Sequence, residues 1–308
     1  MQIDHCLILS AGFGVRMGRI GKILPKILWP VFEKTLLELQ IKYARGLGCK
    51  NIYVNSHFLH EKISQDLKIL SEKNVELIHE PILLGSGGSI HNVANLAKVG
   101  KKGILLVMNG DQFFFPDTTL IHQAMEKIKR HTAVLFSVDV EGEYGEVIIK
   151  NNLLVKINKS PSKKKYPTYS GMGFVNLEKL KITEGFSHFF TSVADFKHEE
   201  IPMLSKGGEY WDFGTFGRYY HSMFDLLDRL IQKKRGLFID FLINSQGIFL
   251  EKINDNIKSY NHDTANVINH SCSFAENPKG HRAIIITSKN KLNINKPGIY
   301  YEDLLEEI

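Results

Sequence analysis

Short apolar runs alternate with amphipathic segments through the first third of the chain. Each run is four to six residues long and ends in small or polar residues, which is typical of strands buried on both faces of a sheet. The segments between the runs place apolar residues at intervals of three and four, which predicts helices. The predicted strands are Cys6–Ser10, Asn51–Asn55, Val75–Ile78 and Gly103–Met108, and the predicted helices are Leu36–Leu47, Ile63–Leu70 and Ser89–Ala97.

This alternation predicts the fold class. Strands and helices that alternate at a spacing of roughly 25 residues indicate an α/β fold with a Rossmann-like, mostly parallel mixed sheet flanked by helices. Ligands of such sheets bind beyond the carboxyl ends of the strands. The loops after Ser10, Ile78 and Met108 are therefore expected to face one cleft.

The pattern changes from Thr132 onward. Three further strands with hairpin-type turns at Gly142, Gly145 and Asn151-Asn152 are predicted, and then a long helix: Ala133–Val140, Glu146–Ile149, Leu153–Ile157 and Phe216–Lys234. We expect residues 1–235 to form one domain that contains the ligand-binding cleft. Residues 236–308 show no repeat or strong motif and form an appendage whose role stays open between oligomerisation, an acceptor-side cap and a degraded accessory domain.

Composition narrows the class of protein. Hydrophobic residues make up 43% and charged residues 23% of the 308 residues, as in ordinary globular proteins. The formal net charge of +6 suits anionic ligands but is a weak sign of nucleic-acid binding, so no nucleic-acid partner is predicted. Three cysteines without paired spacing fit a reducing cytoplasm. The first apolar run is too short for a secretory signal, and no stretch predicts a membrane helix or a membrane partner.

A glycine-rich loop follows the first predicted strand. Gly12 and Gly14 let the backbone approach phosphate oxygens, and Arg16 can pair with phosphates in a fork geometry. Position 17 is Met17, so the loop is not the dinucleotide fingerprint, and no Gly-Lys-Ser/Thr sequence makes it a P-loop. On its residues alone, a plain strand-to-helix turn explains the segment equally well. Lys26, stiffened by the preceding proline, can neutralise an α-phosphate or can be a surface lysine.

The stretch Leu7–Leu39 resembles the signature of sugar-phosphate nucleotidyltransferases. The match runs through a strand, G-x-G-x-R-[ML], a spacer without a gap, P-K-x-L-x-P-[VI] and a helix start. Ser10, Val15 and Thr35 stand where the family usually has alanine, threonine and proline. The resemblance covers residues 3–222, and it implies that Arg16 and Lys26 act on phosphates.

The segment His79–Ile90 resembles the family's base-recognition loop. It contains Glu80, followed by Gly85, Ser86 and Gly87. The glycines would let the backbone close on a flat base and read its edge. A glycine-rich surface loop is the alternative interpretation.

Two aspartates follow motifs that resemble the family's metal-binding segments. Asn109 and Asp111 come after the most apolar strand, where a carboxylate can bind Mg²⁺ beside phosphates or serve as a turn residue. Asp212 lies in a segment similar to the family's late D-x-G-T motif, although Phe216 replaces its proline. The resemblance implies Mg²⁺ as the cofactor, with Asp111 and Asp212 as its ligands.

The acceptor side is less well matched. Gly145 and Gly171 resemble sugar-contact positions, whereas Asn158 stands where the family has the glutamate of its E-K-P element. The resemblance implies an enzyme that transfers a nucleoside monophosphate from an NTP, GTP or UTP, to a sugar-1-phosphate, and it leaves homo-oligomerisation open. The alternatives are a cytidylyltransferase for an alcohol phosphate such as phosphocholine and a non-catalytic nucleotide-binding or sugar-nucleotide-binding regulator.

Overall fold

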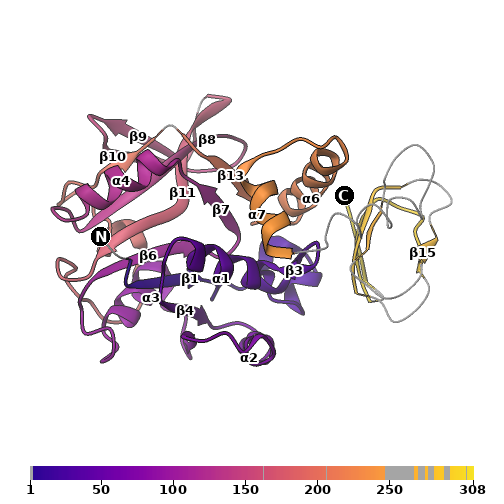
Figure 1. The fold of residues 1–308 in the computed structure, drawn as a ribbon, viewed down its shortest axis with the longest axis horizontal. Helices are drawn as coiled ribbons and strands as arrows, with labels where there is room; N and C mark the ends of the chain where they lie inside the picture. Colours follow the sequence, from indigo (N-terminus) through magenta and orange to yellow (C-terminus); the bar gives the residue numbers. More distant parts are fainter. Residues whose placement is uncertain are drawn as a thin grey trace. The chain divides into compact units, whose positions relative to one another are not determined.

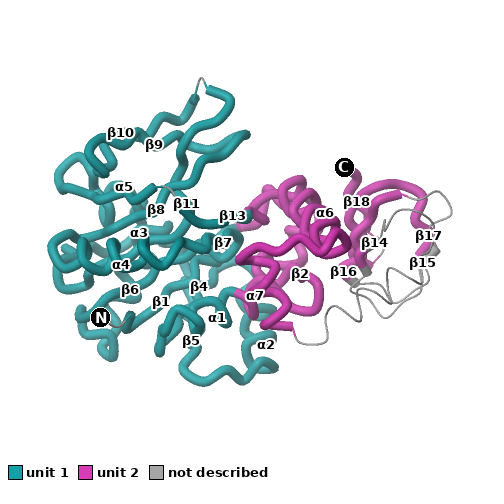
Figure 2. Tube along the Cα trace, turned by 45° about the horizontal axis from the view of Figure 1, so that its top comes forward, with its two compact units in different colours: residues 1–12, 40–211 teal, residues 13–39, 212–308 magenta. Residues whose placement is uncertain are grey.

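The computed structural model describes residues 3–161, 163–205, 207–246, 267–269, 275–276, 281–287, 292–302 and 304–308. The chain divides into two compact units (Figure 2). Unit 1 comprises residues 1–12 and 40–211, and unit 2 comprises residues 13–39 and 212–308. No helix of the described residues is long and apolar enough to cross a membrane.

A seven-stranded sheet forms the centre of unit 1 (Figure 1). Its strand order is β12-β8-β11-β6-β1-β4-β5, with β1, β4, β5 and β6 mutually parallel and β11 antiparallel to both of its neighbours. Its strands are β1 (His5–Leu9), β4 (Asn51–Ser56), β5 (Val75–His79), β6 (Ile104–Asn109), β8 (Ala133–Glu141), β11 (Lys165–Asn176) and β12 (Met203–Leu204). The predicted α/β fold with a mostly parallel mixed sheet is confirmed.

Helices and two small ribbons complete unit 1. The helices are α2 (His60–Leu70), α3 (Gly85–Ala94), α4 (Thr118–Lys127) and α5 (Phe189–Ser192), and α1 (Leu36–Gly46) begins in unit 2 and continues into unit 1. The hairpin β9 (Glu146–Lys150) and β10 (Leu153–Asn158) turns at Asn151-Asn152, both with positive φ, as a tight hairpin turn requires. Strand β7 (Gln112–Phe115) pairs with β13 (Glu209–Asp212).

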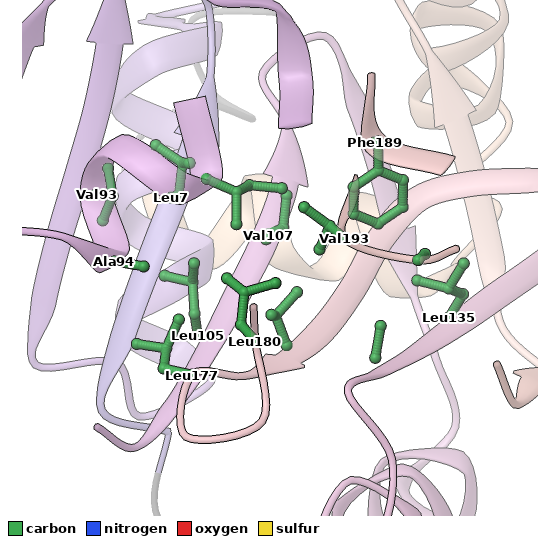
Figure 3. Packing of buried hydrophobic residues seen from close by; sticks show 14 of the residues in the cluster. Leu7, Val93, Ala94, Leu105, Val107, Leu135, Leu177, Leu180, Phe189 and Val193 are labelled. Atoms are coloured by element: carbon green, nitrogen blue, oxygen red, sulfur yellow. The ribbon is translucent and has the colours of Figure 1, made fainter. Parts of the chain in front are cut away.

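Both faces of the central sheet are buried, which explains the continuous apolar runs of the sequence. On one face, Leu7, Val107 and Leu135 pack with Val93 of α3 (Figure 3). The β9–β10 hairpin contributes residues to the same cluster. On the other face, aromatic rings pack together where β8 and β11 pair. The ring centroids of Phe114 and Phe136 lie 5.6 Å apart, and those of Phe136 and Phe174 lie 5.9 Å apart. All three phenylalanines of β7, Phe113–Phe115, are buried.

Unit 2 combines the opening segment of the chain with its C-terminal part. Short strands β2 (Pro30–Val31) and β3 (Lys34–Thr35) pair, and helices α6 (Phe216–Ile231) and α7 (Leu237–Gln246) follow β13 in the chain. Trp29 packs edge-on against Tyr219 of α6 at 4.8 Å between ring centroids. The Tyr219 hydroxyl donates to the Pro30 carbonyl over 2.5 Å. The opening segment is therefore anchored on α6.

The C-terminal part contains stacked strands that the sequence pattern did not reveal. Val267 pairs in register with Ala283, and Ala283 pairs with Gly298, so the paired positions lie 16 and 15 residues apart in the chain. The strands are β14 (Val267–Asn269), β15 (Ala275–Glu276), β16 (Ala283–Thr287), β17 (Leu292–Asn293), β18 (Gly298–Tyr301) and β19 (Leu304–Glu307). Strands β14, β16 and β18 are parallel, and β19 runs antiparallel to β18.

Candidate active site

The glycine-rich opening loop folds into two short 3-10 turns. Gly14 precedes the first turn, Val15–Met17, with φ of +66°, and its carbonyl accepts a hydrogen bond from the Met17 amide over 2.8 Å. The side chain of Arg16 points to solvent. Gly12 is exposed, and no described atom lies within 4 Å of the position that a Cβ would take there. The loop therefore has open space at Gly12 and an exposed guanidinium at Arg16.

Lys26 begins a second element of the same unit. It opens a 3-10 helix, Lys26–Leu28, directly after Pro25, whose φ of −54° leads the chain into the turn. The Trp29 indole nitrogen donates to the Leu24 carbonyl over 3.3 Å and closes this segment. Lys26 is half-buried. Unit 2 thus carries both predicted phosphate-binding cations, Arg16 and Lys26.

Asp111 lies in a tight turn at the carboxyl end of β6. The turn consists of Gly110 and Asp111 between β6 and β7. The Asn109 side-chain amide donates to the Gln112 side-chain oxygen over 2.8 Å, across the base of the turn. The Gly110 amide donates to the Leu9 carbonyl over 3.0 Å, which ties the turn to the end of β1. Asp111 therefore lies at the edge of the sheet where ligands of this fold class bind.

Gly171 is part of the same arrangement. It has φ of +78°, and a Cβ there would lie 2.1 Å from the Gln112 side-chain oxygen and 2.8 Å from the Asn109 side-chain nitrogen. A glycine is thus required for the amide pair to fit against β11. The structure brings together three predicted site residues, Asn109, Asp111 and Gly171, and adds Gln112, which sequence reasoning missed.

A buried polar network lies below the predicted base-recognition loop. Glu80 is 1% exposed and accepts from the Asn55 amide over 2.8 Å and from the Leu84 backbone amide over 3.2 Å. Asn55 also donates to the Ser89 hydroxyl over 3.0 Å and accepts from the Ser10 amide over 2.7 Å. The network joins the ends of β1, β4 and β5 to α3. Both carboxylate oxygens of Glu80 therefore accept hydrogen bonds from the protein, and one of these bonds holds the start of the loop at Leu84.

The glycines of the predicted base loop start a helix instead of an open loop. Helix α3 begins at Gly85, four residues before its expected start at Ser89. The amides of Gly87 and Gly88 donate to the Ser187 carbonyl over 3.0 and 3.3 Å. A Cβ at Gly87 would lie 2.4 Å from the Ser192 hydroxyl oxygen, and one at Gly88 would lie 2.4 Å from the Gly185 carbonyl oxygen. We call residues Gly185–Ser192 the covering segment, because they fill the space beside these glycines.

The remaining two positions of that loop differ in their surroundings. Gly85 has φ of +70°, and a Cβ there would lie 2.6 Å from the Ser187 carbonyl oxygen of the covering segment. Ser86 is half-exposed. Phe186, which packs beside Gly85, is 59% exposed. The face of the loop toward the covering segment is thus occupied by protein, and Ser86 keeps contact with solvent.

Asp212 is the last residue of β13 and belongs to unit 2. One carboxylate oxygen accepts from the Gly214 amide over 2.6 Å, and the other lies 3.3 Å from a guanidinium nitrogen of Arg218. The Thr215 hydroxyl caps α6 by accepting from the Arg218 amide over 3.2 Å. Asp212 is thus held rigidly at a helix start, beside a cation that the sequence analysis did not predict.

The acceptor-side positions lie near the β9–β10 hairpin. The Gly145 carbonyl accepts from the Thr168 hydroxyl over 2.7 Å. Asn158, which replaces the family's glutamate, donates to Glu146 over 3.0 Å. A carboxylate is therefore present at the hairpin, although it comes from β9 and not from position 158.

Three histidines lie near one another: His57 follows β4, His60 begins α2 and His79 ends β5. His60 lies 2.8 Å from the Ser56 hydroxyl and stacks on His79 at 4.0 Å between ring centroids. Burial, followed by the charge of His79, lowers the pKa of His60. His57 lies 2.7 Å from the Glu80 carbonyl oxygen. The described residues contain no cluster of three or more metal-binding side chains.

The donor chemistry of the two aspartates fits Mg²⁺, which takes one or two protein carboxylates and completes its shell with phosphate and water oxygens. Asp111 lies at the ligand edge of the sheet, whereas Asp212 would have to hold the ion in competition with Arg218. Asp111 belongs to unit 1 and Asp212 to unit 2, so a shared site remains a prediction.

Comparisons with known proteins show the family of this chain. The sequence model of the MobA-like NTP transferase domain matches residues 6–168, more than half of the chain. The chain is 26% identical over 203 residues to D-glycero-alpha-D-manno-heptose 1-phosphate guanylyltransferase of Campylobacter jejuni, covering 64% of this chain and 84% of that protein. It is 28% identical over 156 residues to the catalytic subunit beta of mannose-1-phosphate guanylyltransferase of Drosophila melanogaster, covering 49% of this chain. It spans only 42% of that relative's length.

Solved structures share the fold. HddC from Yersinia pseudotuberculosis in complex with GMP-PN superposes with a TM-score of 0.59 at 19% identity, over 72% of this chain and 99% of that chain. UDP-glucose pyrophosphorylase in complex with UDP-glucose superposes with a TM-score of 0.56 at 16% identity, over 76% of this chain and all of that chain (100%). The chain therefore belongs to the family of MobA-like NTP transferase domains, within the sugar-1-phosphate nucleotidyltransferase superfamily.

Proposed function

We propose that this protein transfers a nucleoside monophosphate from an NTP to a sugar-1-phosphate, releasing pyrophosphate and an NDP-sugar. The observation that carries the proposal is the Asn109–Gln112 turn, which holds Asp111 at the ligand edge of a sheet of this family. GTP is the favoured donor and UTP the alternative. Two of the relatives described above are guanylyltransferases, which supports this order.

The reaction is an in-line displacement at the α-phosphorus. An oxygen of the sugar-1-phosphate forms a new bond to the α-phosphorus, and the bond from that phosphorus to the bridging oxygen of the β-phosphate breaks. The attacking phosphate is already an anion, so no general base is needed. Catalysis then consists of alignment and charge neutralisation.

Each predicted residue has a role in that displacement. Arg16 holds the leaving pyrophosphate, because its exposed guanidinium suits a bidentate phosphate contact. Lys26 neutralises the α-phosphate or the acceptor phosphate. Asp111 and Asp212 would hold Mg²⁺, which supplies positive charge to the reacting phosphates when bound. The proposal includes a cytoplasmic location, because NTPs are available there. The described cysteines, Cys6 and Cys49, are free thiols, which is consistent with a reducing compartment.

The substitution Asp111→Asn tests the proposal. We expect it to lower kcat/KM by about a hundredfold, since loss of one such charge costs about 3 kcal/mol of transition-state stabilisation. The measurement is pyrophosphate release with GTP, UTP or CTP and a panel of sugar-1-phosphates. Asp225→Asn is the matched control, because Asp225 forms only an exposed pair with Arg229, at 3.0 Å on α6.

Three outcomes would contradict the proposal in different ways. Turnover only with CTP and phosphocholine would indicate the cytidylyltransferase alternative. Calorimetric binding of an NTP without turnover with any acceptor would indicate a non-catalytic binding protein. An Asp111→Asn variant with the turnover of the wild type would remove the metal role of Asp111.

A further inference from the structure

A buried amide on α1 lies against the turn that carries Asp111. Gln40 is 0% exposed, and its side-chain nitrogen donates to the Gln112 carbonyl over 2.7 Å and to the Asn109 carbonyl over 3.3 Å. These carbonyls stand at the two ends of the Gly110-Asp111 turn. One side chain therefore fixes the separation of both ends.

The burial of Gln40 is costly in itself. Its neighbours Leu39 and Ile41 and the nearby Tyr43 are buried apolar or aromatic residues of the same helix, so an apolar residue would pack at this position. The Gln40 side-chain oxygen has no hydrogen-bond partner among the described residues. A buried polar atom without a partner destabilises a protein by about 1–3 kcal/mol. The amide at position 40 is therefore explained by its hydrogen bonds to the turn and not by the packing of α1.

The turn is also held from its other side. The Asn109–Gln112 amide pair closes its base, and Gly171 leaves the room in which that pair fits. The Tyr43 hydroxyl donates to the Phe114 carbonyl farther along β7, outside the turn. The residues around Asp111 thus form a rigid frame whose members come from α1, β6, β7 and β11.

We propose that Gln40 is the positioning residue of Asp111 and sets the metal affinity of the site. This inference rests on the proposed function, because it assigns Asp111 as a metal ligand. Mg²⁺ demands nearly ideal octahedral geometry, so a shifted turn weakens its binding. Residues that orient metal ligands typically change metal affinity by roughly 10–100-fold when they are replaced. Gln40 contacts neither substrate nor metal in this role.

The test compares Gln40→Met and Gln40→Glu with Tyr43→Phe. Methionine keeps the length of the side chain but donates no hydrogen bond, and glutamate turns an acceptor toward two carbonyl oxygens. Phenylalanine at position 43 removes a buried hydrogen bond to β7 outside the turn. Mn²⁺ binding is titrated by electron paramagnetic resonance with GTP present and the acceptor absent. The Mg²⁺ dependence of pyrophosphate release and the thermal midpoint are measured on the same proteins.

We expect both Gln40 variants to raise the Mn²⁺ dissociation constant about 10–100-fold. Tyr43→Phe should bind Mn²⁺ like the wild type, although its thermal midpoint should fall by as much as that of the Gln40 variants or by more. Gln40→Met with Mn²⁺ binding within twofold of the wild type would overturn the inference. Equal weakening by Tyr43→Phe would also overturn it, because the effect would then be merely structural. Should Gln40→Glu fail to fold, Gln40→Met carries the test alone.

The two proposals fail in distinguishable ways. Wild-type protein that binds Mn²⁺ through Asp111 but turns over no NTP would contradict the proposed function, while the Mn²⁺ titration still decides on Gln40. The opposite result would be a wild-type protein that turns over sugar-1-phosphate and an Asp111→Asn variant that binds Mn²⁺ as tightly as the wild type. That result would overturn the inference about Gln40 alone.

Discussion

Two glycine-rich segments of this chain share a composition and differ in what occupies the space beside them. At Gly12 in the opening loop, no described atom lies within 4 Å of an added Cβ. At Gly87 and Gly88, atoms of the covering segment lie within 3 Å of such a Cβ. The sequence pattern predicted that both segments face a nucleotide. The opening loop leaves open space at Gly12, whereas the start of α3 is closely packed on the side of the covering segment.

The difference shows that a glycine can make room for a ligand or for the chain itself. In α3, the amides of Gly87 and Gly88 already have an acceptor, the Ser187 carbonyl, where a free helix start would offer them to an anion. In the opening loop, Arg16 and the backbone around Gly12 are exposed. Phosphate binding by the opening loop and base recognition at the start of α3 both stay predictions, and the two segments differ in how closely the chain packs beside their glycines.

The largest expected effect is on catalysis, from a substitution at the glycine that has open space beside it. Gly12→Ala should lower kcat/KM on the order of a hundredfold, because the methyl group displaces bound phosphate from its aligned position. The free energy of unfolding should change by less than about 0.5 kcal/mol, since the site is exposed and its φ is not positive. Steady-state kinetics and urea unfolding measure the two effects. Wild-type kinetics in this variant would mean that the open space at Gly12 is not used by the ligand.

The same substitution in α3 should act on stability. Gly88→Ala gains about 1 kcal/mol of helix propensity. Its Cβ, however, would lie 2.4 Å from the Gly185 backbone oxygen, and such overpacking costs about 1–3 kcal/mol. We expect a net loss of about 1–2 kcal/mol in urea unfolding.

A matched control isolates helix propensity from the clash. Gly46, the last residue of α1, has no described atom within 4 Å of an added Cβ, so Gly46→Ala should be neutral or stabilising. A stabilised Gly88→Ala variant would show that the covering segment can move away from the added methyl group at little cost in free energy. The distinction between the two glycine segments would then be lost.

The smallest expected effect concerns pH and the covered side of α3. Burial lowers the pKa of His91 below its usual value of 6.5, and the backbone of Ser192 in the covering segment opposes part of that shift. The unfolded chain therefore binds a proton more readily than the folded protein. Stability is complete above pH 6.5 and falls as the pH drops below it, with a slope of at most about 1.4 kcal/mol per pH unit for one proton.

The variant His91→Gln should flatten this pH dependence in urea unfolding between pH 5 and 7. Burial also lowers the pKa of His5 and His60, so part of the slope should remain. His60→Gln serves as the control on another helix. An unchanged slope in His91→Gln would show that His91 does not report on the packing between α3 and the covering segment.

Several elements follow from local pattern and others do not. The predicted strand at Asn51–Asn55 differs from β4 by one residue, and the predicted helix at Leu36–Leu47 differs from α1 by one residue. Strand β11 was largely missed, because Pro167 and Gly171 interrupt its apolar pattern. Helix α3 starts earlier than predicted, because the Ser187 carbonyl satisfies amides of glycines that would not start a helix alone.

The candidate site divides in the same way. The spacing of Arg16, Lys26 and Asp111 could be read from the chain, because a family motif is a local property. The roles of Gln40, Gln112 and Arg218 could not, because each depends on a partner distant in sequence or on a turn whose geometry the sequence does not show. A glutamine among apolar helix positions was the signal available for Gln40.

The sequence by itself determined the alternation of strands and helices in the first third of the chain, the fold class and the loops that bear charged residues. Hydrophobic periodicity encodes which side of an element is buried, so a single chain suffices for these features. The tertiary structure alone decided what fills the space beside each glycine and which polar side chains support the Asp111 turn. A glycine specifies only the absence of a side chain, and a hydrogen bond between distant residues exists only once the fold has brought them together.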